Sequence, residues 1–210
     1  MPKILYRFLK YHTGRAFESS RYAHLYDAII QTKAQHILEI GVWDGERAAR
    51  MIYVSSYNGS NCHYYGFDLF EDLDEDTYKR EISKRPLSNN DIKIKLADLG
   101  AQVHLFPGNT LDTLPEEVNN LPKMDFIFID GGHNIDTIRN DWFYCSELMH
   151  QHTIVIFDDY WHNRTDHGAK LIVDDIDRSR YDVEVLPEID SFENKDFGRL
   201  DISFAKVYLK

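Results

Sequence analysis

The chain has 210 residues, of which 43% are hydrophobic and 13% aromatic, and its formal net charge is -11 at pH 7. These values exclude a disordered chain, and the length suffices for one domain with a sizeable core. The acidic balance argues against a nucleic acid or an anionic membrane as the main partner, because both require a basic face.

The N-terminal segment places Lys3, Arg7 and Lys10 between short apolar pieces. It lacks the apolar core of a signal peptide, and no run in the sequence approaches a transmembrane span. Cys62 and Cys145 fall on a predicted strand edge and a predicted helix face without the spacing of a metal site, so we expect buried free thiols. The sequence predicts a soluble cytoplasmic domain.

A leading helix is expected after Ser19, where five apolar residues follow helical spacing: Tyr22, Leu25, Tyr26, Ile29 and Ile30. Such a helix either packs beside the ligand site and covers it or only flanks the sheet, and the sequence leaves both open. Residues 1–34 are therefore expected to form an arm and helix in front of a core, residues 35–210, within one domain.

The stretch 37–45, Ile-Leu-Glu-Ile-Gly-Val-Trp-Asp-Gly, runs into the helical pattern of residues 46–52. This order predicts a buried strand, a glycine turn and a helix, which together begin an α/β unit. Gly41 and Gly45 let the backbone turn sharply and approach a ligand, and the helix N-terminus offers it unpaired N–H groups. A nucleotide-like ligand is the first hypothesis.

The spacing of this motif argues against a dinucleotide. A dinucleotide fold requires Gly-x-Gly-x-x-Gly, in which the second glycine makes room for the pyrophosphate. Counted from Gly41, the second and third positions hold Trp43 and Glu46. The motif is instead Glu-x-Gly-x-x-x-Gly, and Glu39 at the end of the strand suits a ligand that carries a cation.

The second strand, 63–69, has Asp68 at its end. In α/β nucleotide sites an acid at this position accepts hydrogen bonds from ribose hydroxyls, although an aspartate is also suited to capping a turn. Residues 70–100 predict a helix, a loop near Pro86 and a second helix that ends at Gly100.

Three more strands follow in the core, at 102–106, 124–129 and 153–157, with a helix over 135–149. Near-continuous apolar strands that alternate with helices predict a mostly parallel sheet covered on both faces, with ligands beyond the carboxyl ends of the strands. Five acids share that edge of the predicted sheet: Glu39, Asp68, Asp130, Asp158 and Asp159.

The chain closes with helical spacing over 168–176 and two strands, 182–186 and 203–209. Because no clear helix separates these two strands, they suit an antiparallel hairpin. This ending differs from a plain dinucleotide fold.

The Glu-x-Gly-x-x-x-Gly motif, Asp68 and the closing hairpin resemble the class I S-adenosylmethionine-dependent methyltransferases. The resemblance implies a Rossmann-like α/β fold with a seven-stranded, mostly parallel sheet, an antiparallel last strand and helices on both faces. It also implies S-adenosylmethionine as the cofactor, with these contacts: Glu39, Gly41, Trp43, Gly45, Asp68, Gly108, Asn109, Thr110 and Asp130. The segment 107–110 is equally suited to a plain turn.

A second set of motifs is Asp130-Gly131-Gly132-His133, then Asp141, then Asp158-Asp159-Tyr160. It resembles the branch that contains macrocin-type and catechol-type O-methyltransferases, over roughly residues 35 to 180. The chain departs from that pattern at Gln151-His152, where paired glycines are common, and at Glu46, where serine or threonine is usual. The second departure bears on the contact to the cofactor's amino-acid part.

Three carboxylates that converge from two adjacent strand ends need a cation to offset their repulsion, and oxygen ligands favour Mg²⁺ over zinc. The resemblance implies that Asp130, Asp158 and Asp159 bind it. It also implies catalytic roles for Asp130 and for His133, whose unperturbed pKa near neutrality suits a base that takes the hydroxyl proton. Each of these residues also has a structural alternative as a helix cap, a cofactor contact or an ordered loop residue.

The predicted function is methyl transfer from S-adenosylmethionine to a hydroxyl of a small molecule or sugar, assisted by Mg²⁺. Two alternatives stay open: a metal-independent methyltransferase that acts on nitrogen or a carboxylate, and a non-catalytic cofactor-binding domain. A nicotinamide oxidoreductase is disfavoured by Trp43. The methyl acceptor and the oligomeric state are not predicted.

Overall fold

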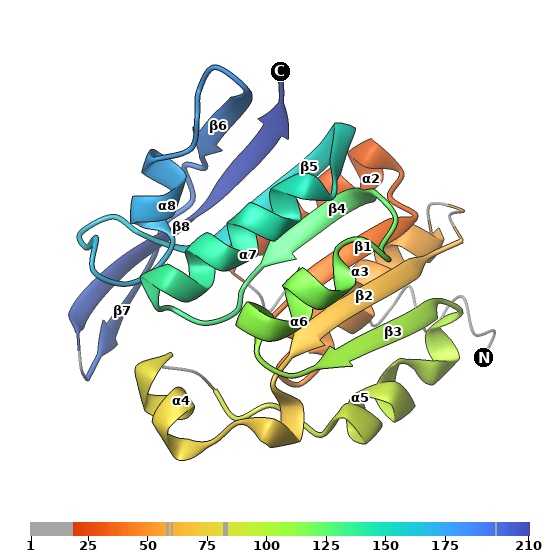
Figure 1. Ribbon diagram of the computed structural model, residues 1–210. Coiled ribbons are helices and arrows are strands. Elements are labelled where there is room, and N and C mark those ends of the chain that lie inside the picture. Colours follow the sequence, from red (N-terminus) through yellow and green to blue (C-terminus); the bar gives the residue numbers. More distant parts are fainter. Residues whose placement is uncertain (1–18, 58, 60, 82–83, 196) are drawn as a thin grey trace.

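The predicted strands form one eight-stranded sheet in the order β3-β2-β1-β4-β5-β8-β6, with β7 paired to β8 (Figure 1). It is seen in a computed structural model that describes residues 19–57, 59, 61–81, 84–195 and 197–210. Most of the expected N-terminal arm lies outside the described residues. The strands are His36–Ile40 (β1), His63–Asp68 (β2), Gln102–Pro107 (β3), Met124–Ile129 (β4), Met149–Trp161 (β5), Tyr181–Val185 (β6), Asp190–Asn194 (β7) and Gly198–Leu209 (β8).

The sheet is parallel from β3 to β5, with β1 at its centre between β2 and β4. β8 runs antiparallel between β5 and β6. This arrangement confirms the expected Rossmann-like fold with a mostly parallel sheet and an antiparallel closing strand. Since parallel strands end at one edge, the turns after β1, β2, β3 and β4 lie along a common rim.

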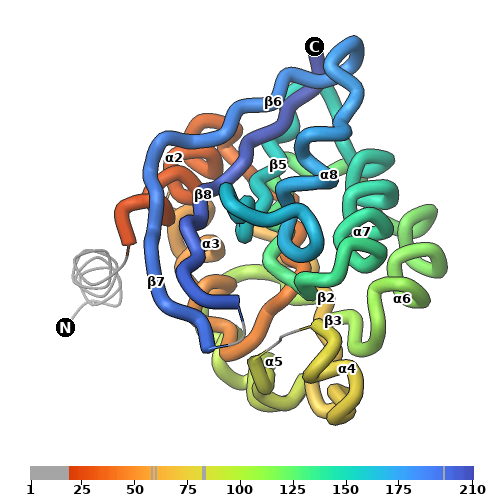
Figure 2. The backbone as a smooth tube through the Cα atoms, turned by 90° about the vertical axis from the view of Figure 1, so that its left-hand side faces the viewer, coloured from red at the N-terminus to blue at the C-terminus, as the bar shows by residue number. Residues whose placement is uncertain are grey.

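The structure adds one strand to the seven expected. β7 precedes β8 in the chain and pairs with its first residues, because β8 begins at Gly198 and not at Ser203. The side chains of β7 are exposed or half-buried, so this strand has no apolar alternation by which a sequence pattern could reveal it. Figure 2 shows β7 beside the beginning of β8, at one side of the sheet.

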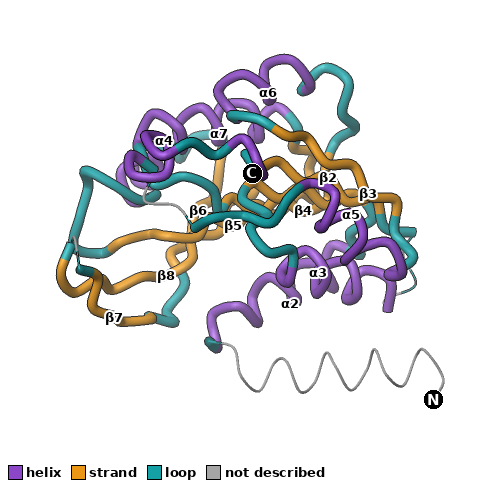
Figure 3. Tube along the Cα trace, turned by 90° about the horizontal axis from the view of Figure 1, so that it is seen from below, coloured by secondary structure: helices purple, strands orange, loops and turns teal. Residues whose placement is uncertain are grey.

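Helices cover both faces of the sheet, and Figure 3 shows α2 and α3 on one side of the strands and α6 and α7 on the other. The α-helices are Ala23–Thr32 (α2), Glu46–Tyr57 (α3), Glu75–Arg80 (α4), Asn89–Leu96 (α5), Thr110–Glu117 (α6), Ile135–Glu147 (α7) and Lys170–Asp174 (α8). Short 3-10 helices are Ser20–Tyr22 (η1), Phe70–Asp72 (η2) and Ala97–Leu99 (η3).

Successive residues of a strand belong in turn to two apolar clusters, one on each face of the sheet. In β1, Ile37 packs with α2, α3 and α5 on one face, whereas Leu38 packs with α6, α7 and α8 on the other. Cys62 and Cys145 are buried and free, as expected. None of the helices in the described residues has the length and apolar character needed to cross a membrane.

Candidate active site

A cavity of about 320 Å³ lies at the carboxyl edge of the sheet, a size common for small-molecule sites. Ten of the residues singled out from the sequence line it: Gly41, Trp43, Asp68, Gly108, Asn109, Thr110, Asp130, His133, Asp158 and Asp159. Glu39 and Gly45 do not. The strand ends therefore bring most of the predicted site together.

Gly41 makes the turn that lets β1 and β4 end side by side. Its φ is 89°, and a Cβ there would lie 1.9 Å from the carbonyl oxygen of Asp130. The two strand ends are joined by a hydrogen bond in which Asp130 N donates to Ile40 O at 2.8 Å. A side chain at Gly41 would force these ends apart, so this position requires glycine.

Asp68 ends β2, and one of its carboxylate oxygens accepts from the turn after β1 and the other from η2. Oδ2 accepts from Trp43 N at 2.8 Å and Oδ1 from Phe70 N at 3.2 Å. Burial raises the pKa of Asp68, although these backbone amides oppose the shift. Each oxygen keeps one acceptor position for a ligand in the cavity.

Glu39 lies deeper than its predicted role requires. Its carboxyl group is fully buried, Oε2 accepts from the Tyr64 hydroxyl, and Oε1 has no hydrogen-bond partner. Burial raises the pKa of Glu39 to about 8. The structural reason is strand alternation, since Glu39 is the penultimate residue of β1 and faces the covering helices, whereas the next residue, Ile40, lines the cavity.

Gly45 serves packing and does not contact the cavity. Its φ is 72°, and a Cβ would approach Ile92 Cδ1 to 2.9 Å, so glycine lets α3 pack closely against α5. Asn109 lines the cavity and also caps α6, accepting from Leu111 N at 3.0 Å. Gly108 N donates to Asp68 O at 3.0 Å, which holds this loop beside the end of β2.

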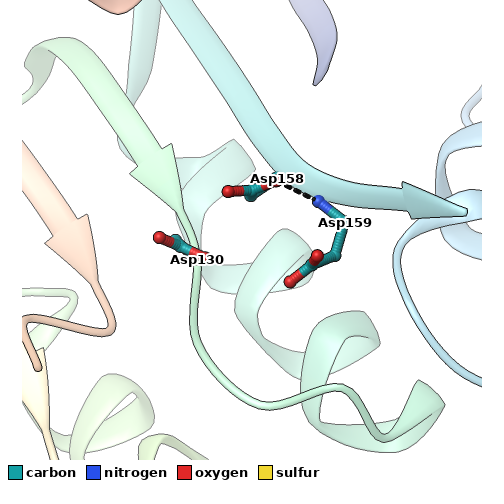
Figure 4. Close-up of side chains that lie close together, drawn as sticks. All are labelled: Asp130, Asp158 and Asp159. Carbon is teal, nitrogen blue, oxygen red and sulfur yellow. Dashed lines mark hydrogen bonds between the residues drawn. The ribbon is translucent and has the colours of Figure 1, made fainter. Parts of the chain in front are cut away.

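Asp130, Asp158 and Asp159 form one cluster in which an oxygen of each lies within 4.8 Å of the others (Figure 4). Neighbouring residues of a regular strand point to opposite faces. Here the pairing with β8 shifts between Phe157 and Tyr160, and Asp159 takes a left-handed φ of 56°. The irregularity re-aims Asp159 so that both carboxylates of β5 face the cluster.

His133 supplies a positive charge at one side of the cluster. Its Nε2 lies 2.8 Å from Asp159 Oδ2, and its Nδ1 donates to the Glu81 carbonyl at 2.7 Å. Although burial disfavours the charged ring, Asp159 raises the pKa of His133 to about 9. Burial likewise opposes ionisation of Asp159, yet the imidazolium lowers its pKa to about 2.

Arg21 supplies a second positive charge, and sequence reasoning missed it. It belongs to η1, its side chain is 8% exposed, and Nη1 donates to Asp158 Oδ1. Burial and repulsion by the neighbouring acids raise the pKa of Asp130 well above its ordinary value, and burial and Asp159 raise that of Asp158. No local pattern marks Arg21, because its partners come from distant strands.

The leading helix, whose role the sequence leaves open, both flanks the sheet and reaches the cavity with the residues at its N-terminal end. Leu25 and Ile29 of α2 are buried against the sheet, whereas Arg21 and Tyr22, just before α2, line the cavity. The helix therefore flanks the sheet and brings its N-terminal end to the site.

Two further walls of the cavity lie in weakly patterned segments. Glu81, only 6% exposed, follows α4 and accepts from Asn134 N at 3.1 Å and Thr137 Oγ1 at 2.9 Å, which joins this segment to the start of α7.

The other wall is largely apolar and combines β5 with β7 and β8: Trp161, Phe192, Asn194, Leu200 and Ile202. The pattern of residues 190–202 gives no sign of this role, whereas the weak patterning of residues 70–95 favours a pocket wall.

The glycine turn after β1, the acid that ends β2 and the acid cluster from the turn after β4 and from β5 match the arrangement of a class I methyltransferase. A family model described as a methyltransferase domain matches residues 38–160. Since this match covers more than half of the chain, the chain belongs to that methyltransferase family.

Solved structures share the fold at low sequence identity. The O-methyltransferase TomG from Streptomyces achromogenes, involved in tomaymycin synthesis and solved with SAM, has a TM-score of 0.61 and 15% identity, covering 100% of this chain and 91% of TomG. An O-methyltransferase from Bacillus cereus, solved with SAH, has a TM-score of 0.60 and 18% identity, covering 97% and 89%. The O-methyltransferase NovP has a TM-score of 0.58 and 17% identity, covering 89% and 76%. No curated protein sequence matches the chain.

Proposed function

We propose that this protein transfers the methyl group of S-adenosylmethionine to a hydroxyl oxygen of a small molecule, acting as a single domain. The observation that carries the proposal is one continuous cavity that joins the glycine turn and Asp68 to the cluster of Asp130, Asp158, Asp159 and His133. The first part suits a nucleoside and the second suits a reacting oxygen. The net charge of -11 supports a small molecule over a nucleic acid as substrate.

The residues of the first part fit the cofactor. Gly41 removes the Cβ that would crowd the turn, and Asp68 keeps one acceptor position on each oxygen for the two ribose hydroxyls. The buried Oε1 of Glu39, which has no hydrogen-bond partner, belongs to the strand that leads into this turn. When bound, the cofactor supplies an electrophilic methyl group on a sulfonium.

The residues around the acid cluster hold the methyl acceptor in place and take the proton from its hydroxyl group. The apolar wall of Trp161, Phe192, Leu200 and Ile202 excludes water from the acceptor body. His133 holds its ring by the Nδ1 bond to Glu81 O, which leaves Nε2 as the nitrogen that exchanges a proton with Asp159 or with an acceptor hydroxyl.

The acid cluster fits Mg²⁺ by its donor chemistry, because it offers carboxylate oxygens alone. Asp158 Oδ1 already accepts from Arg21 and from Asp159 N, whereas Oδ2 accepts only a long bond of 3.4 Å from the Tyr22 hydroxyl. Asp130, Asp158 through Oδ2, and Asp159 would hold the ion. When bound, Mg²⁺ lowers the pKa of the acceptor hydroxyl.

The first experiment is a thermal-shift titration with S-adenosylhomocysteine, with and without Mg²⁺, using NAD as the control ligand. A ligand that binds only the folded state raises the midpoint with concentration, so we expect a shift with S-adenosylhomocysteine and none with NAD. The absence of a shift with S-adenosylhomocysteine would sink the cofactor assignment.

Calorimetric titration of Mg²⁺ into the wild type and Asp159→Ala tests the metal. Weaker binding to the variant supports the assisted O-methyltransferase. Equal binding, or none to either, removes the metal and favours the metal-independent methylation of nitrogen or a carboxylate.

A further inference from the structure

One buried guanidinium joins the acid cluster to the apolar wall of the cavity. Arg21 Nη1 donates to Asp158 Oδ1 within β5, and Arg21 Nε donates at 2.6 Å to Oδ2 of Asp190, the first residue of β7. Asp158 and Asp190 lie on different strands, and no hydrogen bond joins the two side chains. Arg21 is their shared partner.

The remaining contacts of Arg21 fix its position. Nη2 donates to the Tyr22 hydroxyl at 3.2 Å, and the guanidinium carbon lies 4.8 Å from the Tyr22 ring centre and 4.6 Å from that of Phe204. Ser19 Oγ donates to Asp190 Oδ1 at 2.6 Å, so Asp190 is held from both oxygens. Because Nε, Nη1 and Nη2 of Arg21 each donate to a protein group, we assign it to positioning and not to ligand binding. Its planar fork suits the bridging of two carboxylates.

One end of this bridge, Asp158, lines the cavity, and the other, Asp190, begins a hairpin that lines it. Asp190 is the first residue of β7, and the hairpin of β7 and β8 contributes Phe192, Leu200 and Ile202 to the lining. Asp158 Oδ1 carries two donors, from Arg21 and from Asp159 N, so Oδ2 is the oxygen left for the cluster.

We propose that Arg21 is a positioning residue that couples the two halves of the acceptor side: it holds Asp158 with Oδ2 toward the cluster and, through Asp190, holds the β7–β8 hairpin as the wall of the acceptor pocket. The proposal rests on the proposed function only in calling this wall an acceptor pocket. A substitution at Asp158 therefore loosens the hairpin, because Arg21 holds both.

The test is hydrogen exchange of the hairpin amides, residues 190–194 and 198–202, in Asp158→Asn. Without the full charge on Asp158, the bridge weakens, and we expect the hairpin to exchange about tenfold faster than in the wild type. Asp130→Asn is the matched control, because Asp130 belongs to the same cluster but has no hydrogen bond to Arg21; its hairpin should exchange at the wild-type rate. Peptides of β2 serve as the internal reference for global destabilisation.

Glu188→Gln is a second control. Glu188 Oε2 lies 2.6 Å from His24 Nε2, so this pair also joins the leading helix to the segment before β7, but it touches neither Arg21 nor the cluster. Its loss should leave the exchange of residues 198–202 unchanged, whereas Asp190→Asn should raise it as Asp158→Asn does. Equal exchange in Asp158→Asn and Asp130→Asn overturns the coupling.

Arg21→Lys and Arg21→Met separate a bridge from a buried charge. A lysine keeps the charge but cannot reach both carboxylates as a fork, so the hairpin should exchange as fast in Arg21→Lys as in Arg21→Met. Full restoration by lysine would contradict the bridge. If neither variant folds, Asp158→Asn still decides. A thermal shift with S-adenosylhomocysteine on the same samples tests the proposed function separately, because cofactor binding can fail while the coupling persists.

Discussion

His133 forms an ion pair with Asp159 of the acid cluster, with 2.8 Å between Nε2 and Oδ2. The imidazole is also fixed from its other side by the Glu81 carbonyl. Although burial opposes the charge, the pair raises the pKa of His133 to about 9 and so keeps the ring protonated around neutral pH. A ligand that takes Asp159 from the pair would release His133 for proton transfer.

This pair predicts how stability depends on pH. The pKa of His133 is raised to about 9 in the folded protein, above the value of about 6.5 for an unfolded chain, so its contribution is fully present below pH 6.5 and is lost as the pH rises through 9. We expect His133→Asn to be less stable than the wild type by about 2–3 kcal/mol at pH 6 and by much less at pH 10. Urea unfolding at the two pH values measures this. A difference that stays constant with pH would contradict the ion pair.

Substitution of Gly41 by alanine is predicted to be severe. The Cβ would meet Asp130 O at 1.9 Å, in addition to the strain of a positive φ. Gly100→Ala is the matched control, because Gly100 has a φ of 78° and nothing within 4 Å of its Cβ position. We expect Gly100→Ala to lose about 1 kcal/mol of stability and Gly41→Ala at least about 3 kcal/mol, together with binding of S-adenosylhomocysteine. Similar losses in both variants would show that the contact at Asp130 is easily relieved.

Asp68→Asn is predicted to weaken cofactor binding. The amide has one acceptor oxygen, whereas Trp43 N and Phe70 N use two, so one of these N–H groups would face an NH₂ group. We expect the Kd for S-adenosylhomocysteine in calorimetry to rise about 10- to 100-fold, the loss of about one to two charge-assisted hydrogen bonds. Asp177→Asn, a change in an exposed turn away from the cavity, should bind as the wild type does.

Stacked histidines at the start of β1 and β2, at the edge of the sheet opposite the cavity, predict that the folded protein loses stability in acid. The rings of His36 in β1 and His63 in β2 stack with their centres 5.0 Å apart, and burial and the His63 charge lower the pKa of His36. Because the pKa of His36 is lower in the folded state than in the unfolded chain, the unfolded chain takes up the proton first, and stability falls as the pH drops below 6.5. We expect the fall in Tm from pH 7.5 to pH 5.5 to be smaller in His36→Gln than in the wild type, while the exposed His152→Gln shows the full fall.

The parts of the site that sequence could predict are those in which a strand end fixes the position of a side chain. Gly41, Asp68 and Asp130 follow buried strands, and parallel pairing then places them on one rim. The sequence predicts Glu39 on the same rim, but its side chain is buried within β1 and does not line the cavity.

The parts that escaped prediction depend on contacts between distant segments. Arg21 acquires its role from Asp158 and Asp190, which lie 137 and 169 residues away in the chain. β7 has no apolar face and exists through its ladder with β8. Neither feature leaves a local periodicity, so single-sequence patterns could not show them.

β8 follows every other strand in chain order and yet lies inside the sheet, and among the described strands β6 and β7 pair with β8 alone. During synthesis, β6 and β7 therefore have no strand partner until β8 has left the ribosome. The part of the cavity wall that β7 and β8 contribute is thus the last to form. If the proposed assignments hold, a nascent chain with the glycine turn and Asp68 in place meets the cofactor before the proposed acceptor pocket exists.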